Sequence, residues 1–168
     1  MPGYIIHLAV GKIYSQNNKI ENIEEFEKGI LAPDGQKDKG KSHYGQSSSK
    51  PGLDKFIKEN GIKNSYDEGD FLHLLTDHLF YNKFLDKWKP SIYDDYDKLN
   101  YDIIQKYGIT IPERVKEKVK FADGKTKLID KEELYKFIEM VGKIKVREII
   151  SRKEKNDIAD YDFKGGEY

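Results

Sequence analysis

The sequence contains no cysteine. Disulfide bonds and thiolate nucleophiles are therefore excluded, and any metal site must use histidine, aspartate, glutamate or backbone groups. No apolar run approaches the roughly 18 residues that a membrane-spanning helix needs. The stretch from Met1 to His7 has neither the basic nor the apolar region of a signal peptide. We therefore expect a cytoplasmic protein without stable membrane insertion.

An excess of charge of either sign is also lacking. Lys and Arg number 30, as do Asp and Glu, and the pI is about 6.9. Because nucleic-acid-binding proteins usually carry a basic surface, we expect no nucleic-acid partner. Glycine-rich phosphate loops and Gly-x-Ser-x-Gly elbows are absent too, so nucleotide binding and serine hydrolase chemistry have no support. The composition does not indicate an oligomeric state.

The composition is that of a highly charged helical protein. Charged residues make up 36% and hydrophobic residues 37% of the 168 positions, and so polar a chain folds only if its apolar residues are grouped. They recur every three or four residues through most of the chain. This pattern predicts an all-α protein, with one helical domain over residues 1–155 and a frayed or disordered tail over 156–168.

Apolar spacing, Pro90 and Gly108 mark the helix boundaries, and Asp130 with Glu133 has the form of a capping box. The expected helices cover residues 4–14, 22–30, 53–59, 66–85, 92–107, 112–119 and 134–149. Residues 32–52 are polar, and we expect a long loop there. Structureless loops beyond about 15 residues are uncommon in compact domains, so this segment, which carries Asp34 and His43, is interpreted as functional.

The four histidines are at positions 7, 43, 73 and 78. His73 and Asp77 lie four residues apart in the expected central helix, so they share one face. That helix is apolar almost all round, and burying unpaired ionisable groups costs several kcal/mol unless a metal or hydrogen bonds compensate. The spacing alone leaves two interpretations open, a metal site and a satisfied polar network.

The polar residues follow a recognisable order along the chain. His7 is in the first helix, Ala32-Pro33-Asp34 follows the second, Ser42-His43-Tyr44 is in the loop, and His73-Leu74-Leu75-Thr76-Asp77 is in the central helix. This order, over roughly the first 100 residues, resembles the zinc-dependent phospholipase C family.

The resemblance implies a compact multi-helix bundle of the phospholipase C/P1 nuclease type. It implies that His7, Asp34, His43, His73 and Asp77 bind divalent metal ions, with zinc expected and iron or manganese as alternatives. It also implies that Asp34 is the catalytic residue that contacts the attacking water.

Three positions depart from the family pattern. The chain begins Met1-Pro2 instead of with a metal-binding tryptophan, Lys83 stands where the family has a histidine, and no histidine follows His78. Carboxylates can replace histidine as ligands of zinc, iron or manganese. Within the acidic run over residues 94–97 we choose Asp95 as a further metal ligand, because it lies nearest the apolar face of its helix. A ligand role for His78 stays open.

Metal ions bridged by a carboxylate would activate water for attack on a phosphoryl centre. The sequence therefore predicts a metal-dependent phosphoester hydrolase that acts on a small phosphoester or a phospholipid-like substrate. An HD-type phosphohydrolase is disfavoured, since that family needs adjacent His-Asp and the order here is Asp77-His78. The non-enzymatic alternative is a helical module with a structural metal or only a polar network.

Overall fold

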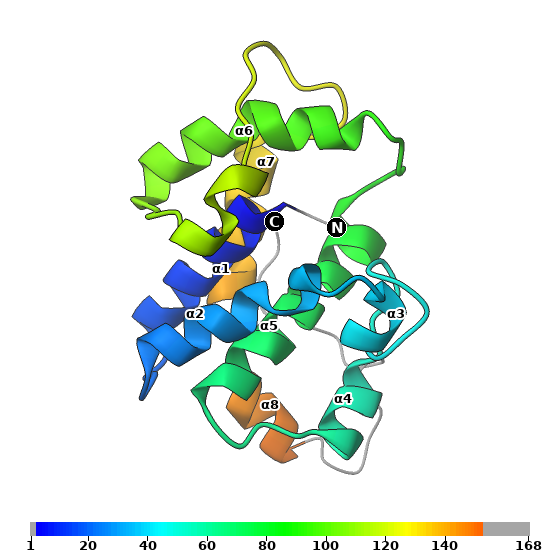
Figure 1. Ribbon diagram of the computed structural model, residues 1–168, viewed down its shortest axis with the longest axis vertical. Helices are drawn as coiled ribbons and strands as arrows, with labels where there is room; N and C mark the ends of the chain where they lie inside the picture. Colours follow the sequence, from blue (N-terminus) through cyan, green and yellow to red (C-terminus); the bar gives the residue numbers. More distant parts are fainter. Residues whose placement is uncertain (1–2, 153–168) are drawn as a thin grey trace.

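The computed structural model describes residues 3–152, and within them the chain is all-α, as predicted. The longer helices are α1 (Tyr4–Asn17), α2 (Ile23–Leu31), α5 (Ser65–Leu79), α6 (Ile92–Tyr107) and α7 (Lys131–Gly142). Figure 1 shows α1, α2, α5 and α7 gathered in the middle of the molecule, with α6 across one end and α4 (Leu53–Glu59) and α8 (Val146–Arg152) at the other. None of the described helices is long and apolar enough to cross a membrane.

Side chains and one glycine set the helix boundaries. Asn22, Asn64 and Asp130 each accept a hydrogen bond from a backbone N–H three residues later, at the first turns of α2, α5 and α7. The cap at Asp130 confirms the start predicted for α7. Gly108 ends α6 with a φ of 64°, which a residue without a Cβ adopts at little cost.

Three predicted helices differ in detail. The helix expected to reach residue 85 is α-helical only to Leu79 and continues as the π-helical turn η2 (Phe80–Phe84). The single helix expected over 134–149 is wrong: α7 and α8 are separate. Apolar spacing hid this break because Ile144 and Val146 are buried as well. The segment expected as a helix over 112–119 is the 3-10 helix η3 (Glu113–Lys118). The predicted domain end at 155 and the predicted tail lie outside the described residues.

The expectation of a structureless loop over residues 32–52 is wrong in part. This segment contains the 3-10 helix η1 (Pro33–Gly35) and the short helix α3 (Lys39–Ser42), which Asp38 caps by accepting from the Lys41 N–H. The Gly52 N–H donates to the His43 carbonyl oxygen at 2.9 Å, which closes the segment on itself. Local hydrogen bonds therefore hold the backbone on both sides of the buried His43 ring.

Helices α2 and α5 pack closely because each presents a glycine to the other. A Cβ atom at Gly29 would overlap the carbonyl oxygen of Tyr66, and one at Gly69 would overlap the carbonyl oxygen of Phe26. This close approach brings the end of α2 to the middle of α5, where the Ile30 carbonyl oxygen lies 2.6 Å from His73 Nδ1. The helix packing thus positions one of the candidate ligands.

Candidate metal centre

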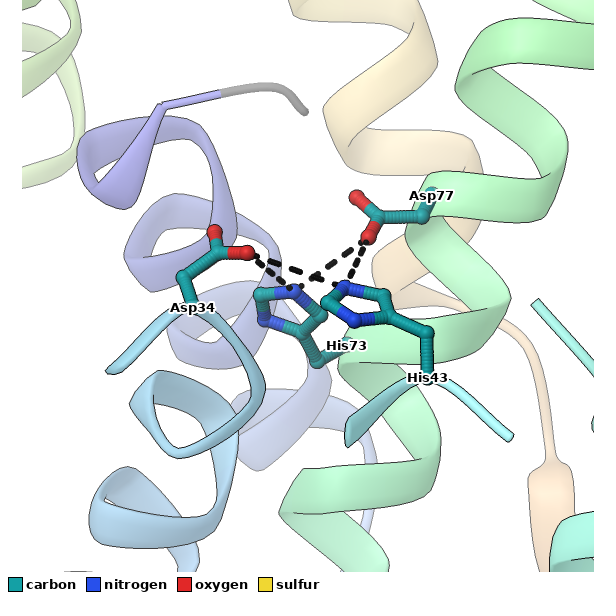
Figure 2. A group of neighbouring side chains, drawn as sticks. All are labelled: Asp34, His43, His73 and Asp77. Carbon is teal, nitrogen blue, oxygen red and sulfur yellow. Dashed lines mark ion pairs between the residues drawn. The ribbon is translucent and has the colours of Figure 1, made fainter. Parts of the chain in front are cut away.

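Five of the side chains predicted as ligands meet in the protein interior. They are His7 from α1, Asp34 from η1, His43 just after α3, and His73 and Asp77 from α5. The most exposed of them, Asp34, has only 5% of its surface exposed. Figure 2 shows Asp34, His43, His73 and Asp77 facing one another from three separate segments of the chain. We call these five residues the buried group.

Asp77 lies at the centre of the buried group. Its Oδ1 is 3.0 Å from His7 Nε2, and its Oδ2 is 3.0 Å from His43 Nε2 and 3.3 Å from His73 Nε2. Asp34 Oδ1 lies opposite, 3.6 Å from His43 Nε2 and 3.4 Å from His73 Nε2. One nitrogen or oxygen from each of Asp34, His43, His73 and Asp77 falls within 4.8 Å of the others. These atoms are close enough to share one cation.

The backbone orients two of the imidazole rings. His73 Nδ1 lies 2.6 Å from the Ile30 carbonyl oxygen, and His43 Nδ1 lies 2.9 Å from the Lys39 carbonyl oxygen. Because a carbonyl oxygen only accepts, the Nδ1 of His73 carries the proton. The Nδ1 of His43 carries it when it donates to the Lys39 carbonyl oxygen instead of accepting from the Ser42 hydroxyl, whose Oγ lies 2.8 Å away. In a neutral ring this leaves the Nε2 lone pair directed at the buried group. Metal-binding histidines are typically held in this way by a hydrogen bond from their other nitrogen.

The atoms that face one another are not satisfied by one another. In the described part of the chain, Nε2 of His7, His43 and His73 and both carboxylate oxygens of Asp34 and Asp77 lack a hydrogen-bond partner of acceptable geometry. Buried polar groups are nearly always paired, since leaving them unpaired is costly. Imidazole nitrogens with carboxylate oxygens are a donor set suited to zinc, iron or manganese. The buried group therefore fits a divalent metal ion.

The charges within the buried group also favour a cation. Burial lowers the pKa of His73, but the carboxylates of Asp34 and Asp77 outweigh burial and raise it to about 10. Burial raises the pKa of Asp77, yet the neighbouring imidazoles hold it well below its ordinary value. Burial, followed by the charge of His73, lowers the pKa of His7. Without a metal, His73 therefore holds a proton between two carboxylates, and a metal ion would displace that proton.

The structure does not bring Asp95 or His78 to the buried group. The Asp95 carboxylate accepts hydrogen bonds from the backbone N–H groups of Lys127, Leu128 and Ile129, at 2.8, 2.7 and 3.0 Å. Its choice as a metal ligand is therefore corrected: it holds the segment that precedes α7. Burial and the charge of Lys83 lower the pKa of His78, which keeps its ring neutral outside the group.

Asp95→Asn is expected to lower stability and leave metal binding unchanged. Asparagine keeps one acceptor oxygen and brings an amide that cannot accept, so backbone N–H groups of residues 127–129 lose partners, at a cost of about 2–3 kcal/mol. Urea unfolding and metal analysis of the variant measure the two quantities separately. A loss of bound metal without a loss of stability would restore Asp95 as a ligand.

Asp70, one turn before His73, is a half-buried carboxyl that the sequence did not single out. Its Oδ1 has no hydrogen-bond partner in the described residues, and burial raises its pKa to about 7. The folded protein then keeps a proton that the unfolded chain loses near pH 4. Stability should fall as the pH rises from about 4 to 7 because of this group.

Asp70→Asn should remove that dependence. In metal-free protein, we expect the free energy of unfolding of the variant, relative to that of the wild type, to increase by about 2 kcal/mol from pH 4.5 to pH 8. Urea unfolding of both proteins at the two pH values measures the change, and the difference between the proteins cancels the other titrating groups. If the difference in the free energy of unfolding between the two proteins is the same at both pH values, the pKa of Asp70 is not raised in the folded protein.

No protein-family model, curated protein or solved structure matches this chain. The five members of the buried group are those that the resemblance to the zinc-dependent phospholipase C family had implied.

Proposed function

We propose that this protein is a metal-dependent phosphoester hydrolase. The observation that carries the proposal is the buried group, in which the Nε2 atoms of three imidazoles lie 3.0–3.6 Å from the oxygens of two buried carboxylates. The order of these residues along the chain, which resembles the zinc-dependent phospholipase C family, supports the same reaction class. A cavity of about 350 Å³ that has Asp34 among its lining residues lies beside the group.

The two oxygens of Asp77 divide the buried group into two halves. Oδ2 faces His43 and His73, together with Asp34 from the other side, and these four residues would hold one metal ion. Oδ1 faces His7 alone among the histidines, at 3.0 Å. A carboxylate can bridge two cations, so His7 and Asp77 Oδ1 would contribute to a second metal position.

Asp34 is the residue best placed for proton transfer. Its Oδ1 faces His43 and His73, whereas its Oδ2 forms no hydrogen bond or ion pair within the described residues. Burial raises the pKa of Asp34, but His73 outweighs burial and the net shift is downward, so the carboxylate is ionised. Oδ2 would accept a proton from the attacking water. A bound divalent metal supplies the acidity of that water and stabilises negative charge on the phosphoryl group.

Metal analysis followed by an activity panel tests this proposal. Untagged protein should contain zinc, iron or manganese, and it should hydrolyse a phosphomonoester or phosphodiester in a reaction that a chelator abolishes and one metal restores. His43→Ala should lose both metal and activity. His78→Ala, which removes a histidine outside the buried group, is the matched control and should retain both.

The near-complete burial of the group favours one second function, a helical module with a structural metal. His43 and Asp77 are each 0% exposed, which is more closed than a catalytic site needs. If the metal-loaded protein hydrolyses nothing across the panel, while His43→Ala loses metal and only lowers the melting temperature, the structural role replaces the catalytic one. Absence of any bound metal would contradict both.

A further inference from the structure

A second cavity, of about 660 Å³, lies between the segment over residues 32–52, the π-helical turn η2 and the start of α6. Three consecutive serines, two lysines, one asparagine and three aromatic residues line it. Its volume is within the range of small-molecule sites. No member of the buried group lines this cavity, which we call the aromatic cavity.

Two aromatic side chains of this cavity leave half of their surface exposed. Trp88 is 49% and Tyr93 is 50% exposed, and their ring centroids lie 6.5 Å apart at an interplanar angle of 81°. Tyr93 also contacts the buried Tyr96 edge to face, at 5.8 Å, which supports its ring from behind. Two rings at this angle form a corner, in which a third ring can stack on one face and meet the edge of the other. The exposed surfaces of Trp88 and Tyr93 therefore suit an aromatic ligand.

One wall of the aromatic cavity has an uncommon backbone. In the turn η2 the N–H of the residue after the turn donates to the carbonyl oxygen of Phe80, five residues earlier, at 2.8 Å. Such π-helical turns are rare and often occur at functional sites. This turn supplies Tyr81 and Asn82 to the lining, and Asn82 Nδ2 donates to the Ser49 carbonyl oxygen at 3.2 Å. The turn therefore holds the serine side of the cavity in place.

The charge of the aromatic cavity is positive. Lys39 and Lys50 line it, no acidic residue does, and neither lysine has an ion-pair partner in the described part of the chain. Lys39 Nζ donates to the carbonyl oxygens of Asp34 and Gln36, both at 2.6 Å, which fix the ammonium group without neutralising its charge. Lys50 is exposed. Two unopposed ammonium groups favour an anion in the cavity.

We propose that the aromatic cavity binds a small organic anion that carries an aromatic ring. The ring stacks on Trp88 and Tyr93, and the charged group lies toward Lys39 and Lys50. The inference goes beyond the proposed function and does not rest on it, because none of the metal ligands lines the cavity.

Benzenesulfonate tests the inference, because it combines one aromatic ring with one negative charge and is a poor ligand of metal ions. Calorimetric titration of the full chain should show binding, with the same affinity in zinc and in chelator. Methanesulfonate, which lacks the ring, and benzyl alcohol, which lacks the charge, should each bind more weakly. Trp88 is the only tryptophan of the chain, so binding should also change the tryptophan fluorescence.

Two variants with matched controls locate the ligand. Trp88→Ala should weaken benzenesulfonate binding about tenfold, since it removes the larger of the two stacking surfaces. Lys50→Met should weaken it about threefold, because an exposed ammonium is partly screened by water. Both residues are exposed, so neither change endangers folding. Phe121→Ala and Lys58→Met remove an exposed aromatic residue and an exposed lysine that do not line the cavity, and both should bind like the wild type.

The outcomes separate this inference from the proposed function. If benzenesulfonate does not bind, or if Trp88→Ala and Lys50→Met bind it as tightly as the wild type, the inference is overturned and the metal centre is unaffected. Binding that requires zinc and is equally tight for methanesulfonate would place the anion at the metal centre and also overturn the inference. A chain that binds no metal, but binds benzenesulfonate through Trp88 and Lys50, would contradict the proposed function and support the aromatic cavity.

Discussion

Asp77→Asn is expected to lower the affinity for zinc by at least about 100-fold. Asp77 is the one residue of the buried group that contacts all three imidazoles, at 3.0, 3.0 and 3.3 Å. Asparagine has nearly the same shape but no charge, and its amide nitrogen cannot coordinate a cation. All three imidazoles therefore lose the charge of their common carboxylate partner in this one variant.

The same variant should also destabilise the metal-free protein. His73 carries a proton there, because Asp34 and Asp77 raise its pKa to about 10. Removing the Asp77 carboxylate leaves the buried, positively charged His73 with only the Asp34 carboxylate as a partner. This should lower the free energy of unfolding by about 3 kcal/mol. Zinc titration with a competing chelator measures the affinity, and urea unfolding in chelator measures the stability.

Asp95→Asn is the control that distinguishes the two effects of Asp77→Asn. Both variants exchange a fully buried aspartate for asparagine, and both should be less stable than the wild type. Only the change at Asp77 should reduce zinc binding. If Asp77→Asn binds zinc as tightly as the wild type, the buried group is a polar network and the metal interpretation is wrong.

Zinc is expected to raise the melting temperature and to slow proteolysis between Pro33 and Lys50. A ligand that binds only the folded state at about 1,000 times its Kd adds about 4 kcal/mol to the free energy of unfolding. The effect should concentrate in this segment, because it contributes Asp34 and His43 and otherwise consists of two short helical turns and polar residues. Two ligands on one metal would tie both turns to α5.

A lysine-specific protease measures this protection directly. Lys37, Lys39, Lys41 and Lys50 lie in the segment. Lys120 and Lys125 lie in an exposed stretch that contributes no residue to the buried group, and they serve as an internal control. Zinc should slow cleavage at the first set and leave the second unchanged. His43→Ala should abolish the difference. Equal cleavage of the segment in zinc and in chelator would show that it takes no part in the site.

Of the five members of the buried group, only His73 and Asp77 have a local signature in the sequence. His73 and Asp77 share a helix face by their spacing alone. The interleaved order of His7, Asp34 and His43 carried the rest, through a resemblance to a known arrangement of ligands. Asp95 showed the limit of such reasoning, since its acidic neighbours and apolar helix face were equally consistent with a ligand and with a structural carboxylate.

By itself, the sequence determined the helical class, the cap at Asp130, the helix end at Gly108 and the restriction of metal ligands to imidazole and carboxylate. These depend on residue types and on spacings within a few turns of helix. The tertiary structure decided that Asp95 binds the backbone of residues 127–129 and that the segment over 32–52 contains two short helices. Each of these depends on which atoms, far apart in the sequence, come within hydrogen-bond distance of one another. The packing of the helices, such as that of α2 on α5, determines those distances.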